Sequence, residues 1–278
     1  MAETGGLGKQ IEQNNHKLSA RATIMPEERR RRIARLVREA GSVTVALLEA
    51  EFGISPMTAR RDLVALEEEG RVRRTHGGAV LPEYAGHEDS FWYRLEEAVE
   101  AKERLAGAAV GLLEPGASVF LDCSTTSYYL ARRILREGPR VTLLTNSVPV
   151  MELFMKNEAP KTGVIGVGGL MRKLTLSFVG PHAVRTISSH SADRAFVSVK
   201  GVTLEGFLTD PDVLEAEVKR AMIEHSEEPV LLVDGSKFER RGLSVITHAS
   251  KLSRAFAANA PEEQLQPLVL AGVEVRCV

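Results

Sequence analysis

The chain has 278 residues, which at about 100–200 residues per domain allows one large domain or two smaller ones. Lys and Arg total 36 and Asp and Glu total 37, so the net charge of −1 excludes the strongly basic balance of a histone or a ribosomal protein. The two cysteines, Cys123 and Cys277, are too few and too far apart for a disulfide framework, and no zinc-ligand spacing is present. We therefore expect a reducing, cytoplasmic location and no metal or other cofactor.

No segment of the sequence predicts export or a membrane partner. The N-terminus lacks the apolar region of a signal peptide. The longest apolar runs, residues 229–233 and 267–270, are far shorter than the ~20 residues of a membrane helix. Charge is distributed unevenly, because residues 1–80 hold 14 basic and 11 acidic side chains and the rest hold 22 and 26. This polarity indicates a basic module attached to an acidic one.

Residues 1–23 are rich in Gly, Asn and Gln, and we expect a disordered tail there. Residues 24–81 predict a compact unit of three helices, because capping and breaking residues divide the chain at regular intervals. These residues are Pro26, Gly41, Thr44, Gly53, Ser55 with Pro56, and Gly70. A basic, strand-like segment, residues 71–75, follows the third helix and leads into His76-Gly77-Gly78.

The third helix has two distinct faces. Ala59, Leu63 and Leu66 share the apolar face, while Thr58 and Arg61 lie on another, with Arg60 beside them. Helix, short helix, glycine turn, helix and basic β-segment is the organisation of a winged helix-turn-helix, whose third helix fits the major groove of DNA. The alternative is a small helical bundle with solvated arginines.

Residues 82–117 are interpreted as a linker and connecting helix. An amphipathic stretch begins at Phe91 and Trp92 and continues to Leu113, before Glu114-Pro115-Gly116 ends it. We expect the aromatic pair to lie in a core or an interface. The stretch is also a candidate element for dimerisation and for coupling between domains.

Residues 118–278 alternate apolar strand-like runs with helical patterns. Six strands are predicted, at residues 119–121, 141–144, 162–167, 195–199, 230–233 and 273–275. Helical patterns lie near residues 128–135, 148–155, 183–187, 214–223 and 262–270. This rhythm predicts an α/β domain, with a mainly parallel sheet covered by helices on both faces.

The sequence resembles the DeoR-type bacterial transcription regulators over residues 25–278. In the N-terminal part the resemblance rests on the string from Ser55 to Leu63, on Leu66-Glu67 and Gly70, and on the string from Arg73 to Ala79. Further on, it rests on Leu121-Asp122, Thr125-Thr126, Leu144-Thr145-Asn146, Gly168-Gly169, residues 177–180, Glu215-Ala216, Lys219, Met222 and residues 234–238.

The resemblance implies a winged helix-turn-helix followed by a Rossmann-like sensor domain similar to phosphosugar isomerases. It further implies a sequence-specific regulator, in most of the family a repressor of carbohydrate catabolism genes. The implied partners are double-stranded operator DNA, a phosphorylated sugar or related effector, and further copies of the chain in a homodimer or higher oligomer.

The resemblance implies DNA contacts from the third helix and the wing. Arginine suits this role because its fork donates two parallel hydrogen bonds to guanine or to phosphate. Asp62 is interpreted as an intramolecular partner that fixes an arginine. The residues expected to contact DNA are Ser55, Thr58, Arg60, Arg61, Arg73, Arg74, His76 and Gly77.

A phosphorylated effector needs anion donors at one end and hydroxyl partners along its body. Residues 122–126 follow a strand and precede a helix, where backbone N–H groups and hydroxyls bind phosphate. Serine stands at 124 where the family usually has glycine, and Lys200 is not the family's commonest residue. The expected effector residues are Asp122, Ser124, Thr125, Thr126, Thr145, Asn146, Gly168, Gly169, Lys200, Glu215, Lys219 and Lys237, with Asp234 orienting Lys237.

Each of these assignments has a plainer alternative. Residues 122–126 also fit an ordinary helix cap, the glycines a turn, and Lys200 a solvated side chain. Glu215 and Lys219 also fit an i, i+4 ion pair. For the whole protein, the second hypothesis is an isomerase or transferase that uses Asp122, Asp210, Asp212 and Glu215 as acids or bases. A purely structural DNA-binding protein would leave the α/β domain unexplained.

Overall fold

The computed structural model describes residues 24–80, 89–158, 162–238 and 240–278. The chain divides into two compact units, residues 1–83 and residues 84–278. The predicted tail, residues 1–23, and residues 82–88 of the predicted linker lie outside the described residues. None of the described helices has both the length and the apolar character that crossing a membrane requires.

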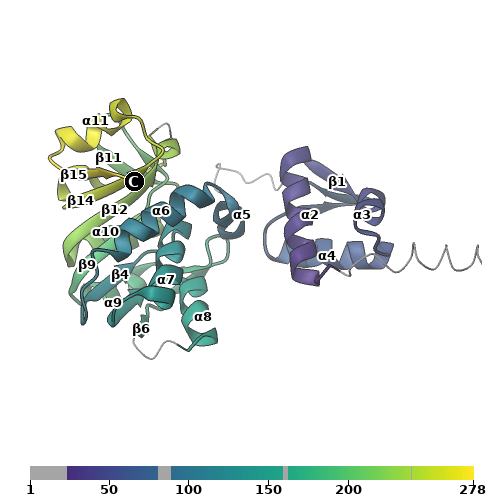
Figure 1. Ribbon diagram of the computed structural model, residues 1–278, viewed down its shortest axis with the longest axis horizontal. Helices are drawn as coiled ribbons and strands as arrows, with labels where there is room; N and C mark the ends of the chain where they lie inside the picture. The colour runs from purple at the N-terminus through teal and green to yellow at the C-terminus, as the bar shows by residue number, and fades with distance from the viewer. Residues whose placement is uncertain (1–23, 81–88, 159–161, 239) are drawn as a thin grey trace, which may run out of the picture. The chain divides into compact units, whose positions relative to one another are not determined.

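The described residues of the N-terminal unit, 24–80, form three helices and a small antiparallel sheet (Figure 1). The helices are α2 (Pro26–Ala40), α3 (Val45–Phe52) and α4 (Pro56–Glu68), and the strands are β1 (Ser42–Thr44), β2 (Arg73–Thr75) and β3 (Gly78–Val80). The sheet has the order β1-β3-β2. Strands β1 and β3 were not predicted, because three residues are too few to display an alternating pattern.

The predicted helix boundaries of this unit are confirmed. The Thr44 hydroxyl accepts from Leu47 N at 3.1 Å and the Ser55 hydroxyl from Thr58 N at 3.2 Å, so each caps its helix. Gly53 ends α3 with a φ of +62°, a backbone conformation that residues with a Cβ rarely adopt, and the chain turns there toward α4. Below these turns, Ala59, Leu63 and Leu66 are buried in the core of the unit, as their spacing predicts.

A seven-stranded parallel sheet, in the order β15-β14-β12-β9-β4-β5-β6, is the centre of the C-terminal unit. Its strands are β4 (Ser118–Leu121), β5 (Val141–Thr145), β6 (Thr162–Gly166), β9 (Ala192–Val197), β12 (Ser226–Asp234), β14 (Arg254–Ala258) and β15 (Glu274–Cys277). Six of them match the predicted runs. β14 was missed because its alanines favour helix over strand.

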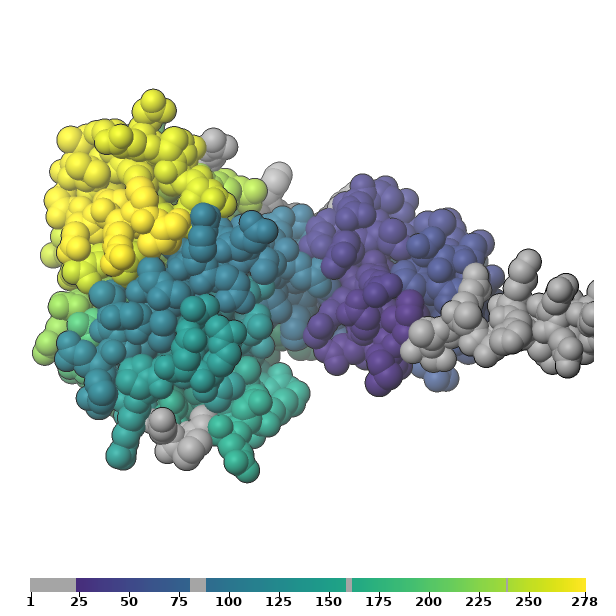
Figure 2. Space-filling model, in the orientation of Figure 1, coloured from purple at the N-terminus to yellow at the C-terminus, as the bar shows by residue number. Residues whose placement is uncertain are grey.

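Helices cover both faces of this sheet. On one face lie α6 (Val99–Val110), α7 (Thr125–Glu137) and α8 (Val148–Lys156), and on the other α9 (Pro181–Ser188), α10 (Val213–Glu224) and α11 (Glu262–Leu270). In Figure 2 the blue and teal atoms of α6 and α7 cover the side toward the viewer. Along β4, Val119 and Leu121 face the first layer and Phe120 the second, as the period of two requires.

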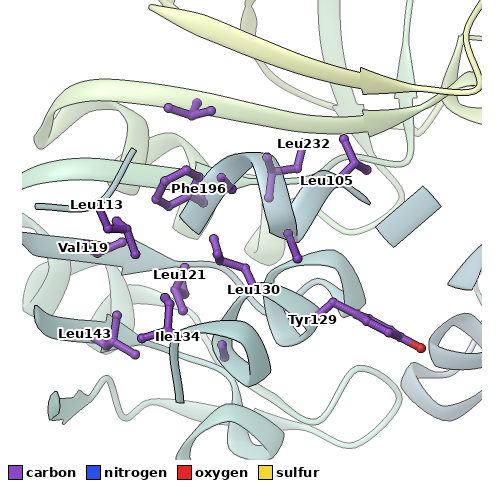
Figure 3. Close-up of a cluster of buried hydrophobic side chains, with 14 of the residues drawn as sticks. Leu105, Leu113, Val119, Leu121, Tyr129, Leu130, Ile134, Leu143, Phe196 and Leu232 are labelled. Carbon is purple, nitrogen blue, oxygen red and sulfur yellow. The ribbon is translucent and has the colours of Figure 1, made fainter. Parts of the chain in front are cut away.

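The core between the sheet and α6 and α7 is built of large apolar side chains (Figure 3). Leu105 of α6 and Leu130 of α7 are at most 1% exposed and pack with Phe196 of β9. Two small sheets complete the unit: the hairpin of β7 (Leu170–Arg172) and β8 (Ser177–Val179), and the strands β10 (Gly201–Val202), β11 (Phe207–Asp210) and β13 (Ser244–His248). Short 3-10 turns, η1 (Gly235–Lys237) and η2 (Ala249–Lys251), follow β12 and β13.

The predicted amphipathic stretch from Phe91 to Leu113 is two helices rather than one. Between α5 (Phe91–Glu96) and α6 the chain turns at Ala98, whose φ is +47°. Phe91 is fully buried and packs edge-on against Tyr128 of α7, with the ring centroids 5.7 Å apart, so the prediction of a core role is confirmed for it.

Candidate functional site

A buried ion pair fixes α4 within the N-terminal unit. Arg29 of α2 donates to Asp62 of α4 at 2.6 Å, and both side chains are less than 10% exposed. The prediction that Asp62 holds an arginine is confirmed, although the sequence did not identify Arg29 as the partner. The pair fixes α4 against α2 from its buried side and leaves its outer face open.

The outer face of α4 carries polar and basic side chains. Arg60 and Arg61 are exposed beside Met57, which is 65% exposed. The hydroxyls of Ser55 and Thr58 lie 2.9 Å apart at the first turn and bond to each other. The face thus combines hydrogen-bond donors with a short apolar surface, a combination that suits the edges of bases.

Strand β2 and the turn after it present the other predicted contact residues. Arg73, His76 and Gly77 are exposed. Arg74 is bound to Glu67 of α4, with Nε donating to a carboxylate oxygen at 2.6 Å, and this bond lowers the pKa of Glu67. The pair joins the hairpin to α4.

In the C-terminal unit a polar cavity lies where the strand order reverses. The chain adds β5 and β6 on one side of β4 and places β9, β12, β14 and β15 on the other. Ligands of open α/β sheets bind beyond the carboxyl ends of the strands at such a switch point. The residues that follow β4, β9 and β12 line the cavity here, and one wall is formed by Asp89, Arg94, Glu97, Ala98 and Lys102.

The cavity is lined by more cationic than anionic side chains. The cations are Arg94, Lys102, Lys200, Lys219, Lys237 and Arg240, and the carboxylates are Asp89, Glu97, Asp210 and Asp234. Ser124, Thr125, Thr126, Ser198 and Ser236 add hydroxyls. An excess of positive charge together with hydroxyl groups suits a ligand that is anionic at one end and hydroxylated elsewhere.

Ser124 caps α7 at the floor of this cavity. Its φ of −70° is ordinary for serine, so the conformation of the loop does not need a glycine at this position. The Ser124 hydroxyl accepts from Ser127 N at 3.1 Å, and Thr125 and Thr126 begin the helix. The first amides of a helix have no acceptor within it, so this turn is suited to an anion.

Lys219 is the centre of a buried ionic cluster next to the cap. Its ammonium donates to Asp210 and to the carbonyl oxygen of Ser198, the latter at 2.8 Å, and lies 3.6 Å from Asp122. Burial alone lowers the pKa of Lys219, but the two carboxylates outweigh burial and hold the pKa above its ordinary value. Burial raises the pKa of Asp210 to about 6, although Lys219 opposes the shift.

Glu215 is bound elsewhere, so the alternative of an i, i+4 pair with Lys219 is not what the structure has. The Glu215 carboxylate accepts from Thr175 and from Ser177, the latter at 3.1 Å, and pairs with Arg172 at 3.2 Å. These bonds fasten the β7–β8 hairpin to α10.

The remaining lysines of the cavity each lie near a carboxylate or carbonyl oxygen. Lys200 lies 3.4 Å from Asp89, and Lys237 lies 3.8 Å from Asp234, which agrees with the predicted orienting role of Asp234. Lys102 donates to the carbonyl oxygens of Arg94 and Glu97. Burial, followed by the charge of Lys237, lowers the pKa of Lys102 to about 8, and burial likewise lowers the pKa of Lys237.

Six of the twelve predicted effector residues line the cavity: Ser124, Thr125, Thr126, Lys200, Lys219 and Lys237. Asp122, Thr145, Asn146, Gly168, Gly169 and Glu215 lie outside the lining, and an effector contact from them stays a prediction. Strands β5 and β6 lie on the other side of β4 from β9, so their ends are one and two strands removed from the switch point. At Gly169 a Cβ would come within 2.6 Å of the Val179 carbonyl, so close packing accounts for that glycine.

Sequence reasoning missed the residues that reach the cavity from the connecting segment and from the loop after β12. Arg94, Lys102 and Arg240 are the cations among them. One signal was present for Lys102, because it shares a helical face with the buried Leu105 and Ala106. A lysine on the apolar face of a helix is rare unless its ammonium has partners.

The carboxylates of the enzyme hypothesis are engaged in structural bonds. Asp212 caps α10 by accepting from Leu214 N and Glu215 N, both at 3.0 Å. Asp122, Asp210 and Glu215 are tied to serines, threonines, Lys219 or Arg172, as described above. Within the described ranges, no group of three or more His, Cys, Asp or Glu is placed to hold a metal ion. Cys123 is buried, which raises the pKa of its thiol well above the ordinary value.

Comparison with known proteins gives consistent matches to both units. Residues 29–85 match the family described as the DeoR-like helix-turn-helix domain, and residues 97–257 match the DeoR C terminal sensor domain. A ribose 5-phosphate isomerase A from Methanocaldococcus jannaschii is similar at 19% identity over 50% of this chain and 54% of that one, with a TM-score of 0.36.

Two curated relatives span nearly the whole chain. The putative aga operon transcriptional repressor of Escherichia coli O157:H7 is 33% identical over 89% of this chain and 92% of its own. The glycerol-3-phosphate regulon repressor of Haemophilus influenzae is 31% identical over 89% of this chain and 98% of its own. With relatives named as transcriptional regulators rather than enzymes, and with both domains of the family in order, this chain belongs to the DeoR family of transcriptional regulators.

Proposed function

We propose that this chain represses carbohydrate catabolism genes and that a phosphorylated sugar in the C-terminal cavity changes its affinity for operator DNA. The observation that carries the proposal is the cavity itself, which six cationic side chains and the first turn of α7 line together at the switch point of the sheet. A phosphate group has up to two negative charges and three acceptor oxygens, which such a set of donors satisfies.

The names of two relatives support this class of ligand. One is tied by name to the aga operon and one to the glycerol-3-phosphate regulon. A hydroxylated body for the ligand fits the hydroxyls of Ser124, Thr126 and Ser236, which share the cavity with the cations. Carboxylates such as Asp234 then offer acceptors to the sugar hydroxyls.

DNA binding is assigned to α4 and the β2–β3 turn. We place α4 in the major groove, with Arg60 and Arg61 directed at base edges or phosphates, and Arg73 at the flanking backbone. Ser55, Thr58, Arg74, His76 and Gly77 complete the proposed interface. Because the effector acts only through unequal affinity for two states, it must bind the operator-competent and operator-released forms differently.

A homodimer or a higher oligomer is the proposed working unit. One winged helix makes few base contacts, and two copies on a repeated operator add their contacts together. Light scattering of the purified protein tests this. We expect at least twice the mass of one chain, and a monomeric mass at the concentrations that bind operator would contradict the proposal.

A thermal-shift screen against phosphorylated and free sugars, sugar acids and polyols tests the effector assignment. Binding to the folded state raises the melting temperature, so a shift confined to a phosphorylated sugar is the expected result. A shift only with unphosphorylated compounds would remove the phosphate from the proposal. Operator sites are obtained in parallel by selecting bound duplexes from randomised DNA.

A further inference from the structure

The guanidinium of Arg94 is incompletely paired inside the cavity wall. Its Nε and Nη2 atoms are buried, and neither has a hydrogen-bond partner in the described part of the chain. Arg94 lines the cavity from α5, and its charge influences the pKa values of Lys102, Lys237, Asp210 and Glu215. A buried guanidinium without acceptors costs free energy that an anionic partner recovers.

The backbone of α5 is seated on the same turns of α7 that form the floor of the cavity. Thr125 donates to the Arg94 carbonyl oxygen at 3.4 Å, and the Tyr129 hydroxyl donates to the Leu95 carbonyl oxygen at 3.2 Å. Lys102 of α6 donates to the carbonyl oxygens of Arg94 and Glu97. These bonds hold the main chain of α5 and leave the two guanidinium nitrogens of Arg94 for another acceptor.

We propose that Arg94 binds the anionic group of the effector, so that the bound effector joins α5 to the first turn of α7. The planar fork of arginine matches two oxygens of a phosphate at once, and Lys102 and Lys237 supply charge nearby. The inference rests on the proposed function, because it names the residue that would hold the proposed ligand. It also makes α5, the first described helix after the N-terminal unit, an element that the bound ligand stabilises further.

Inorganic phosphate and the variant Arg94→Met provide the test. Methionine fills similar space without charge, so we expect the melting temperature without phosphate to stay the same or rise by a few degrees. We expect the affinity for phosphate, measured from the thermal shift, to fall at least about tenfold. Arg136→Met is the control, because that side chain is 62% exposed outside the cavity. It should leave the phosphate response unchanged.

The change in melting temperature and the change in phosphate affinity together distinguish a ligand-binding residue from a structural one. If Arg94 only supported the fold, Arg94→Met would lower the melting temperature without phosphate. A variant that still bound phosphate with wild-type affinity would overturn the inference and leave the proposed function standing. A wild-type protein that responded neither to inorganic phosphate nor to any phosphorylated sugar would contradict the proposed function itself, and the inference with it.

Hydrogen exchange tests the consequence for α5. With saturating phosphate, the amides of residues 91–97 should exchange more slowly in the wild type. In Arg94→Met they should not respond, even at phosphate concentrations raised to restore occupancy. Slower exchange of residues 91–97 in this variant, or none in phosphate-bound wild type, would contradict the joining of α5 to α7 by the ligand.

Discussion

Asp122 joins the segments that follow β4 and β9 although it has no exposed surface. One carboxylate oxygen accepts from Ser124 N at 3.0 Å and from the Ser127 hydroxyl at 2.6 Å, and the other accepts from Ser198 N at 2.9 Å. Both oxygens of Asp122 therefore accept hydrogen bonds. A carboxylate can do this at both positions, whereas an amide has only one oxygen.

Replacing Asp122 with Asn tests this role. The asparagine amide group must turn its NH₂ toward one of these donors and so lose a hydrogen bond. The buried ammonium of Lys219 also loses one of its two nearby negative charges. We expect a loss of about 3 kcal/mol in the free energy of unfolding, measured by denaturant titration. Asp193→Asn is the matched control, since Asp193 also accepts from a serine N and hydroxyl but is exposed. Equal losses in the two variants would contradict the assignment.

The pKa of Lys102 gives the effector site a pH dependence. Near pH 8 the buried ammonium is half deprotonated in the free protein, and a bound anion favours the charged form. Binding should therefore take up protons near pH 8, and the affinity for phosphate should fall as the pH rises above 8. Calorimetry in buffers of different ionisation enthalpy measures the uptake.

Lys102→Arg keeps the charge at all these pH values and should reduce the proton uptake. Some proton uptake should remain in this variant, because burial also lowers the pKa of Lys237. Proton release on binding, or a phosphate affinity that rises between pH 8 and pH 10, would contradict this account.

Arg61 lies on the exposed face of α4, opposite the apolar residues of the helix. Arg61→Ala should lower operator affinity about tenfold or more, because a bidentate contact to guanine contributes about 1–3 kcal/mol. The melting temperature should not change, since the side chain is exposed. Anisotropy titration of a labelled operator duplex measures the loss, and wild-type affinity would exclude Arg61 from the interface.

At the scale of elements, the two arginines of β2 have different environments. Arg74 is compensated by Glu67, whereas Arg73 is exposed. Arg73→Ala should weaken binding to all duplexes alike and flatten the dependence of log affinity on log salt by about one unit, because one phosphate contact is lost. A salt dependence equal to that of the wild type would place Arg73 away from the DNA backbone.

Elements with strong local signals could be predicted from the sequence. The caps at Thr44 and Ser55, and the turn at Gly53, fix the helices of the N-terminal unit through bonds between near neighbours. β14 could not be predicted, because its alanines become a strand only between β12 and β15. Buried parallel pairing of this kind overrides local preference.

The candidate site was predictable only where it follows strand ends. The loop at Ser124 and the lysines after β9 and β12 lie there, and the structure brings them together, whereas Lys219 lies within α10 and was expected from the family resemblance. Arg94 and Lys102 come from helices ahead of the first strand of the sheet, so only the tertiary fold brings them to the cavity. Asn146 also follows a strand, but that strand, β5, lies away from the switch point. The side-chain amide of Asn146 donates to the carbonyl oxygen of Phe178 instead.

At the scale of the whole molecule, the chain combines a DNA-binding unit with a ligand-binding unit, and each has a core of its own. The central claim is that a phosphorylated ligand in the second unit changes the affinity of the first for operator. Reciprocity follows from this coupling, because operator DNA must then change the affinity for the ligand by the same factor.

The most direct test titrates operator duplex with the protein, with and without the phosphorylated sugar found by thermal shift, for wild type and Lys237→Ala. The account predicts that the ligand shifts operator affinity at least about fivefold in the wild type. In Lys237→Ala, operator affinity without ligand should be unchanged and the response to ligand reduced. A wild-type operator affinity that stays constant while the ligand saturates the cavity would contradict the account.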